Sequence, residues 1–83
     1  MTLEARLRRL RWRCRRGMLE LDLMLQRYLE QQGPNPDATE LSAFEALLEC
    51  PDHELCQWLL GNGHPPETRL GSVVAAIRRA AER

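Results

Sequence analysis

The sequence of 83 residues has no lysine and only four aromatic side chains: two tryptophans, one tyrosine and one phenylalanine. It also lacks any apolar run near the length of about 18 residues that a membrane-spanning helix needs, so we expect no membrane insertion. So short a chain forms one domain at most, which we place at residues 1–83. With 43% hydrophobic residues, leucine-rich helices are its economical route to a core.

The chain has three cysteines, an odd number, and no secretory signal accompanies them. We therefore expect free thiols and a reducing, cytoplasmic setting.

Four side chains of zinc-ligand type are spaced C-x2-H-x2-C-x7-H: Cys50, His53, Cys56 and His64. Pro51 falls between two of them. Cys56 shares a helical face with Leu59, where a free cysteine acts as a small core hydrophobe. The pattern therefore predicts no metal site.

Catalytic motifs are missing too. The chain has no G-x-S-x-G, no H-E-x-x-H and no glycine-rich phosphate loop. Cys14 has no histidine near it in the sequence that could activate it as a nucleophile. We therefore expect that the protein is not an enzyme.

The charges are unevenly distributed although they sum to zero. Residues 1–16 hold seven arginines and one acidic residue, residues 17–67 one arginine and ten acidic residues, and residues 68–83 four arginines and one acidic residue. This pattern is compatible with complementary charges inside the fold and equally with an anionic partner.

Apolar residues recur at helical spacing in five segments, and nothing alternates with the period of a strand. The pattern predicts an all-α, single-domain five-helix bundle with short connections. The expected inward residues are, in chain order, Leu3, Leu7, Leu10 and Cys14; Leu21, Met24, Leu25, Tyr28 and Leu29; Leu41, Phe44, Leu47 and Leu48; Leu55, Trp58 and Leu59; and Leu70, Val73, Val74, Ile77 and Ala81.

Local signals predict the helix ends. Gly33 and the prolines after it end the second helix, and Asp37, three positions before Glu40, caps the third. Pro51 breaks the pattern, and Asp52 is expected to cap the fourth helix. Trp12 lies off the first apolar stripe, and on a continuous helix it would lie near Arg8, Arg9 and Arg16.

The stretch RRGMLELD, residues 15–22, places the first glycine where the basic segment becomes acidic. Arg16 and Glu20 are four positions apart, so on one helix they would share a face. Glu20 also suits the positive end of a helix that begins here. Gly17 supplies either a backbone angle that other residues avoid or a close approach between surfaces.

Two longer stretches resemble a known family. WRCRRGMLELD, residues 12–22, is similar to the R-G-x-x-E region of the small FAD assembly factors for succinate dehydrogenase, the succinate dehydrogenase assembly factor 2 family. FEALLECPDHELCQWL, residues 44–59, is similar to the family's F-x-x-L-L-E-x-x-D-x-x-L-x-x-W-L segment. The similarity covers roughly residues 4–80. Cys56 stands where the family often has an aromatic residue, and the loop around Gly33 varies.

This resemblance implies a small five-helix bundle that acts as a chaperone. Its client would be the flavoprotein subunit of succinate dehydrogenase, and in bacteria also that of fumarate reductase, to which it helps attach FAD covalently. The chain itself would hold no cofactor stably and would act on the FAD of its client. The resemblance implies these partner-binding residues: Arg9, Trp12, Arg15, Arg16, Gly17, Met18, Glu20 and Asp22.

The resemblance also suggests roles within the motif. Gly17 would let the client backbone approach, Arg16 would make a forked bond to it, and Glu20 would orient Arg16 or accept a bond. The alternative is a nucleic-acid-binding or regulatory, antitoxin-like module that uses the arginine-rich first helix, with Trp12 stacking on a base. Because the whole chain is neutral, we expect no nucleic acid as partner.

Overall fold

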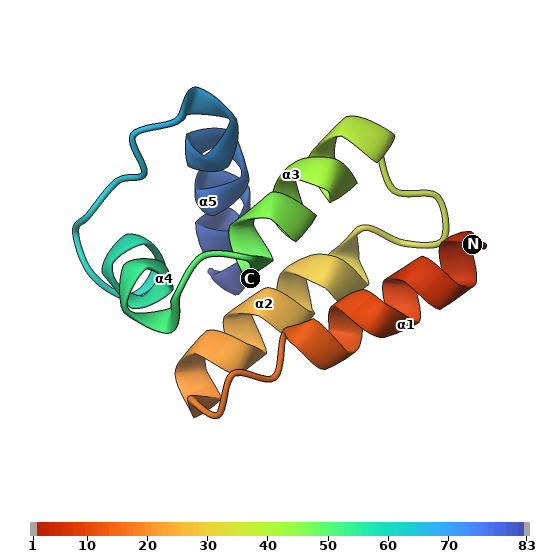
Figure 1. Ribbon diagram of the computed structural model, residues 1–83, viewed down its shortest axis with the longest axis horizontal. Coiled ribbons are helices and arrows are strands. Elements are labelled where there is room, and N and C mark those ends of the chain that lie inside the picture. Colours follow the sequence, from red (N-terminus) through yellow and green to blue (C-terminus); the bar gives the residue numbers. More distant parts are fainter. Residues whose placement is uncertain (1, 83) are drawn as a thin grey trace.

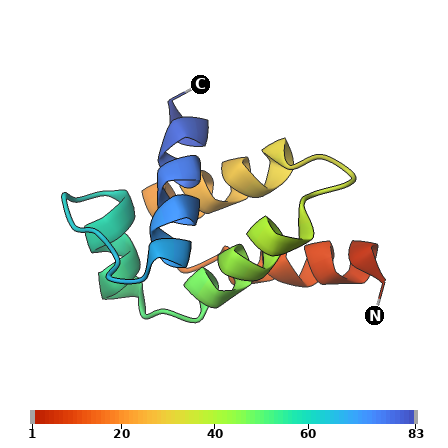
Figure 2. The same cartoon turned by 90° about the horizontal axis from the view of Figure 1, so that it is seen from above.

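A computed structural model describes residues 2–82 and shows five helices, which confirms the all-α prediction. The described part contains no strand. The helices are α1 (Leu3–Arg13), α2 (Leu19–Gln31), α3 (Ala38–Leu48), α4 (Asp52–Leu59) and α5 (Thr68–Ala81) (Figure 1). Figure 2 shows α5 running at a steep angle to α2 and α3, with α4 at the end of the molecule away from the N-terminus.

The ends of the helices follow the local sequence at most positions. The Asp37 carboxylate accepts from the backbone N–H groups of Thr39 and Glu40 at 2.8 and 3.0 Å, which confirms the predicted cap of α3. Gly33 follows the end of α2 with a φ of +72°, an angle that favours glycine.

The predicted cap of α4 is wrong. Pro51 occupies the capping position, and Asp52 is the first helical residue and makes no side-chain cap. Its carboxylate instead accepts from the side chain of Arg16. An ion pair with a distant arginine has replaced the local bond that the sequence suggested.

One cluster of buried side chains draws on all five helices. The buried residues are Leu10, Cys14, Leu21, Leu25, Tyr28, Leu29, Leu41, Ala43, Phe44, Leu47, Leu48, Leu55, Trp58, Leu59, Leu70, Val73, Val74, Ile77 and Ala80. Ala43 is buried although it was not predicted to be, and the predicted residues Leu7 and Met24 are only partly buried. Two further details differ from the predicted pattern. Ala80, three positions after Ile77, is buried where Ala81 was expected, because one residue turns the helix by about 100°. Leu3, in the first turn of α1, is exposed.

The first helix is fastened to α3 by polar contacts. Arg6 pairs with Glu45 and also donates to the Ser42 hydroxyl at 3.4 Å. This leaves Arg8, Arg9 and other arginines of α1 exposed. None of the helices between residues 2 and 82 is both long enough and apolar enough to cross a bilayer.

Candidate functional site

The candidate site lies at the connection between α1 and α2, which we call the Gly17 corner (residues 14–18). Gly17 has a φ of +87°, in the left-handed region where any other residue is strained. A Cβ atom built on Gly17 would meet no heavy atom within 4 Å. The glycine is therefore required by the backbone turn, and the space above it is open to a partner.

The corner is tied to α2 through Asp22. This carboxylate accepts from the backbone N–H of Arg16 at 2.8 Å and from that of Gly17 at 3.3 Å. Because Asp22 lies in the first turn of α2, the two bonds join the corner to the start of that helix. Asp22 thus supports the backbone that carries Gly17.

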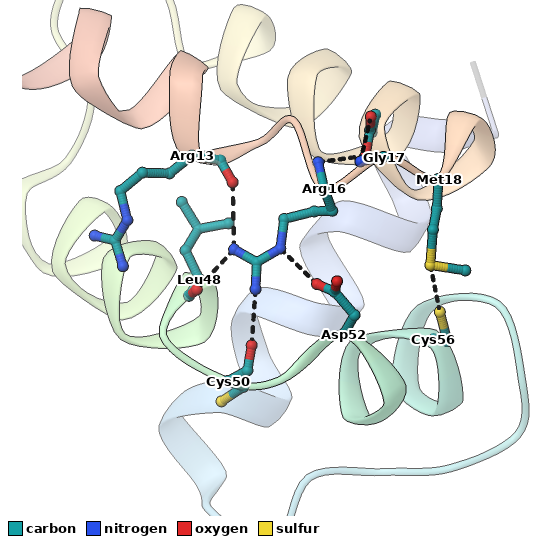
Figure 3. A network of polar contacts seen from close by, with 9 residues as sticks. Arg13, Arg16, Gly17, Met18, Leu48, Cys50, Asp52 and Cys56 are labelled. Atoms are coloured by element: carbon teal, nitrogen blue, oxygen red, sulfur yellow. Dashed lines mark hydrogen bonds and ion pairs between the residues drawn. The ribbon is translucent and has the colours of Figure 1, made fainter.

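The corner is tied to the rest of the fold through the guanidinium of Arg16 (Figure 3). Its Nε donates to Asp52 at 2.7 Å, and Nη1 and Nη2 donate at 2.9 Å to the carbonyl oxygens of Leu48 and Cys50. A further bond of 3.3 Å reaches the carbonyl of Arg13. Leu48 is the last residue of α3 and Cys50 follows that helix. Arg16 therefore donates to carbonyls that have no donor within the helix.

This geometry differs from the expectation that Arg16 and Glu20 share a helical face. The first helix ends at Arg13 and the second begins at Leu19, so the two residues do not lie on one helix. The Arg16 side chain is only 17% exposed and pairs with Asp52. Glu20 is exposed in the first turn of α2, where the helix dipole favours an acid, and it does not orient Arg16.

Met18 lies at the edge of the corner and contacts α4. Its sulfur is 3.5 Å from the Sγ atom of Cys56, the contact drawn at the right of Figure 3. The side chain remains partly open to solvent. The corner is therefore fixed on one side by Arg16 and on the other by Met18.

Trp12, near the end of α1, is 67% exposed. The guanidinium carbon of Arg15 lies 5.0 Å from the centre of its ring, within cation–π range. The exposed side chains of Arg8 and Arg11 lie around the same ring. Arg16, which the sequence placed near Trp12, turns inward.

The cysteine closest to the motif is not suited to chemistry. Cys14 is fully buried, and burial raises the pKa of its thiol to about 12. Burial also raises the pKa of the Cys50 thiol. All three cysteines are free, and among residues 2–82 no three histidine, cysteine or acidic side chains gather as metal ligands would.

The predicted site residues therefore occupy two kinds of position. Arg16 and Asp22 face inward and hold the corner, whereas an exposed group remains on the outside: Arg9, Trp12, Arg15, Gly17, Met18 and Glu20. The sequence interpretation missed Asp52 as a partner of Arg16. No local signal could have revealed it, because the two residues are 36 positions apart.

Comparison with known proteins agrees with the motif. The model of a protein family described as flavinator of succinate dehydrogenase matches residues 8–81. The chain belongs to this family. This confirms the family resemblance that the two sequence stretches predicted.

Similar proteins are found in several bacteria, each named FAD assembly factor SdhE. The chain is 44% identical over 70 residues to the one from Legionella pneumophila, covering 84% of this chain and 87% of that protein. It is 38% identical over 72 residues to that of Coxiella burnetii, covering 87% and 88% of the two chains. For Pseudomonas aeruginosa the identity is 39% over 74 residues, covering 89% and 88%. No solved structure matches the chain.

These names describe assembly factors for a flavin enzyme. Membership of the flavinator family therefore agrees with the prediction that the chain is not itself an enzyme.

Proposed function

We propose that this protein binds the flavoprotein subunit of succinate dehydrogenase, and also that of fumarate reductase, and promotes covalent attachment of FAD to them. The observation that carries the proposal is the Gly17 corner of a chain that belongs to the flavinator family. It offers an open backbone, where a Cβ atom on Gly17 would meet no heavy atom within 4 Å, on a turn held by Arg16 and Met18.

The corner is suited to hold a partner in one arrangement. A rigid binding surface loses little conformational freedom when it docks, so more of the contact energy remains to orient the partner. Correct alignment of a reacting side chain with its cofactor can supply a large share of a rate enhancement. In this proposal the reacting groups and FAD belong to the client, and this chain holds no cofactor stably.

Arg16 has a different role from the forked bond to the client that the motif suggested. Four donor contacts inside the chain engage its guanidinium. It acts on the client through the shape of the corner. The direct contacts come from the exposed group: Gly17, Met18 and Glu20, with Arg9, Trp12 and Arg15 beside them.

Covalent flavin in the client tests the proposal. The flavoprotein subunit would be expressed with this protein, with its Gly17→Arg variant, or alone, and flavin fluorescence would be read in a denaturing gel. We expect strong fluorescence with the intact protein only. Gly33→Arg is the matched control, because it adds the same charge at a glycine with positive φ and open space, at the other end of α2.

Each outcome is informative. Equal fluorescence in all samples would overturn the proposed function. Loss with both arginine variants would indicate that strain or charge, and not the surface at Gly17, causes the defect. The same series with the fumarate reductase subunit tests the second client.

The free thiols and the bacterial relatives support a cytoplasmic setting.

One observation favours a second candidate, binding of nucleic acid. The exposed arginines around Trp12 resemble a surface that grips phosphates and stacks on a base. This candidate predicts binding to any duplex that weakens steeply as salt rises. Titration with duplex and single-stranded oligonucleotides at several salt concentrations separates it from client binding, because no flavin is involved.

A further inference from the structure

Three exposed apolar side chains occur together at the start of α2. Leu19 is 75% exposed and Leu23 is 49% exposed, and Met18 beside them is also exposed. We call these three residues the Leu19 patch. Contiguous apolar side chains on the surface of a small domain are a mark of an interaction site.

The patch lies off the buried side of α2. Leu21 and Leu25 are fully buried, and Leu19 and Leu23 each lie two positions before one of them. Two positions turn a helix by about 200°, so the two exposed leucines point away from the core. They are four positions apart and therefore share one face. The fold needs neither of them for its core.

The backbone beneath the patch is fixed. Asp22 binds the N–H groups just before it, Arg16 joins the corner to Asp52, and Met18 contacts Cys56. Leucines on such a support lose little freedom when they are covered. Removal of their apolar surface from water would favour association.

The surroundings have the composition of an interface rim. Glu20, exposed between the two leucines in sequence, and Arg15, exposed before the corner, bear charges of opposite sign. An apolar centre with a polar edge is typical of protein–protein contacts. Gly17 adjoins the patch and carries no side chain that would hold a partner away.

From these observations we infer that Leu19 and Leu23 form the apolar anchor for the flavoprotein client, and that they enter an apolar depression of the client next to the point where it approaches Gly17. This inference rests on the proposed function and names the contact that carries its binding energy. Because Arg16 is engaged inside the chain, Leu19 and Leu23 supply the apolar centre of the contact, with the exposed charges of Glu20 and Arg15 at its edge.

The test measures affinity of the full chain for the purified flavoprotein subunit, by calorimetry or an optical biosensor. The variant is Leu19→Ser with Leu23→Ser, and the matched control is Leu3→Ser. Leu3 is 40% exposed and lies near Leu29 and Gly33, at the opposite end of α2. Circular dichroism establishes that all three proteins are equally helical.

We expect the double variant to bind roughly ten- to a hundredfold more weakly, and Leu3→Ser to bind as the parent does. An apolar contact should also keep most of its affinity when salt rises from about 50 to about 500 mM. Unchanged affinity of the double variant overturns the inference while leaving the proposed function intact.

Two other results have distinct meanings. If the parent protein itself does not bind the subunit, the proposed function fails and the inference fails with it. If sedimentation shows that the parent self-associates, and the double variant becomes monomeric with full affinity for the subunit, the patch is covered by a second copy. That result also overturns the inference.

Discussion

The Nε atom of Arg16 lies 2.7 Å from a carboxylate oxygen of Asp52, a residue 36 positions further along the chain. This contact joins the connection between α1 and α2 to the connection between α3 and α4 (Figure 3). The same guanidinium satisfies the carbonyls of Leu48 and Cys50. Arg16 therefore holds the backbone turn at Gly17 against the connection between α3 and α4.

Arg16→Ala is expected to lower the free energy of unfolding by about 2–3 kcal/mol, because it leaves three carbonyls and the Asp52 carboxylate without this donor. Urea unfolding followed by circular dichroism measures this. Arg6→Ala is the control, since its pair with Glu45 is about one-third exposed on both sides and should contribute less than about 1 kcal/mol. Equal losses of stability in the two variants would contradict this structural role of Arg16.

Gly17→Ala is expected to destabilise the protein by about 1–2 kcal/mol, because alanine at a φ of +87° is strained even with space around it. Gly71→Ala is the opposite case. Gly71 lies inside α5, where a Cβ atom also meets nothing within 4 Å, so alanine should stabilise by about 0.5–1 kcal/mol. Thermal unfolding of the two variants and of the parent measures these opposite changes in stability. A stabilising effect at both glycines would refute the strained turn.

Stability is expected to fall above pH 9. Burial raises the pKa of Cys14 from 9.0 to about 12, so between these values the unfolded chain has released the thiol proton and the folded chain still holds it. The free energy of unfolding then decreases as pH rises, by at most about 1.4 kcal/mol per pH unit for this group. Urea unfolding of the parent and of Cys14→Ala between pH 9 and 10 should show a shallower slope for the variant. Parallel slopes would rule out this contribution.

The same effect is expected for Tyr28 at slightly higher pH. Burial raises the pKa of this phenol from 10.0 to about 12, with Glu40 and Asp37 adding to the shift. The folded state therefore loses stability as pH rises from 10 to 12. Absorbance at the wavelength of phenolate should show Tyr28 ionising together with unfolding. Ionisation well before the loss of helical signal would disprove the prediction.

The two tryptophans should report separately. Trp12 is 67% exposed and Trp58 is 7% exposed. Trp12→Phe is expected to remove the long-wavelength emission that is quenched by acrylamide, and to change stability by no more than about 0.5 kcal/mol. Trp58→Phe should remove the short-wavelength emission and destabilise by about 1–3 kcal/mol. Emission spectra of the folded variants test these assignments. Loss of the short-wavelength emission in Trp12→Phe would contradict them.

Much of the fold follows from the sequence alone because the signals that determine helices are local. Apolar spacing identifies all five helices, and the Asp37 cap depends on residues two and three positions away. The family resemblance rests on short stretches in the same way. Errors arise at single positions, such as Ala81 for Ala80, where one residue of rotation separates the core from its edge.

The site depends on tertiary structure. Neither the inward turn of Arg16 nor the role of Asp52 could be predicted, because the Asp52 carboxylate and two of the three carbonyls that bind Arg16 come from residues 48–52, more than thirty positions away in the sequence. The exposure of Leu19 and Leu23 likewise depends on which side of α2 the other helices cover. The sequence by itself thus determined the five helices, the need for glycine at the turn at position 17, and the family. Only the packing of those helices decided which motif residues hold the corner and which face a partner, because contacts between distant segments leave no periodic trace in the chain.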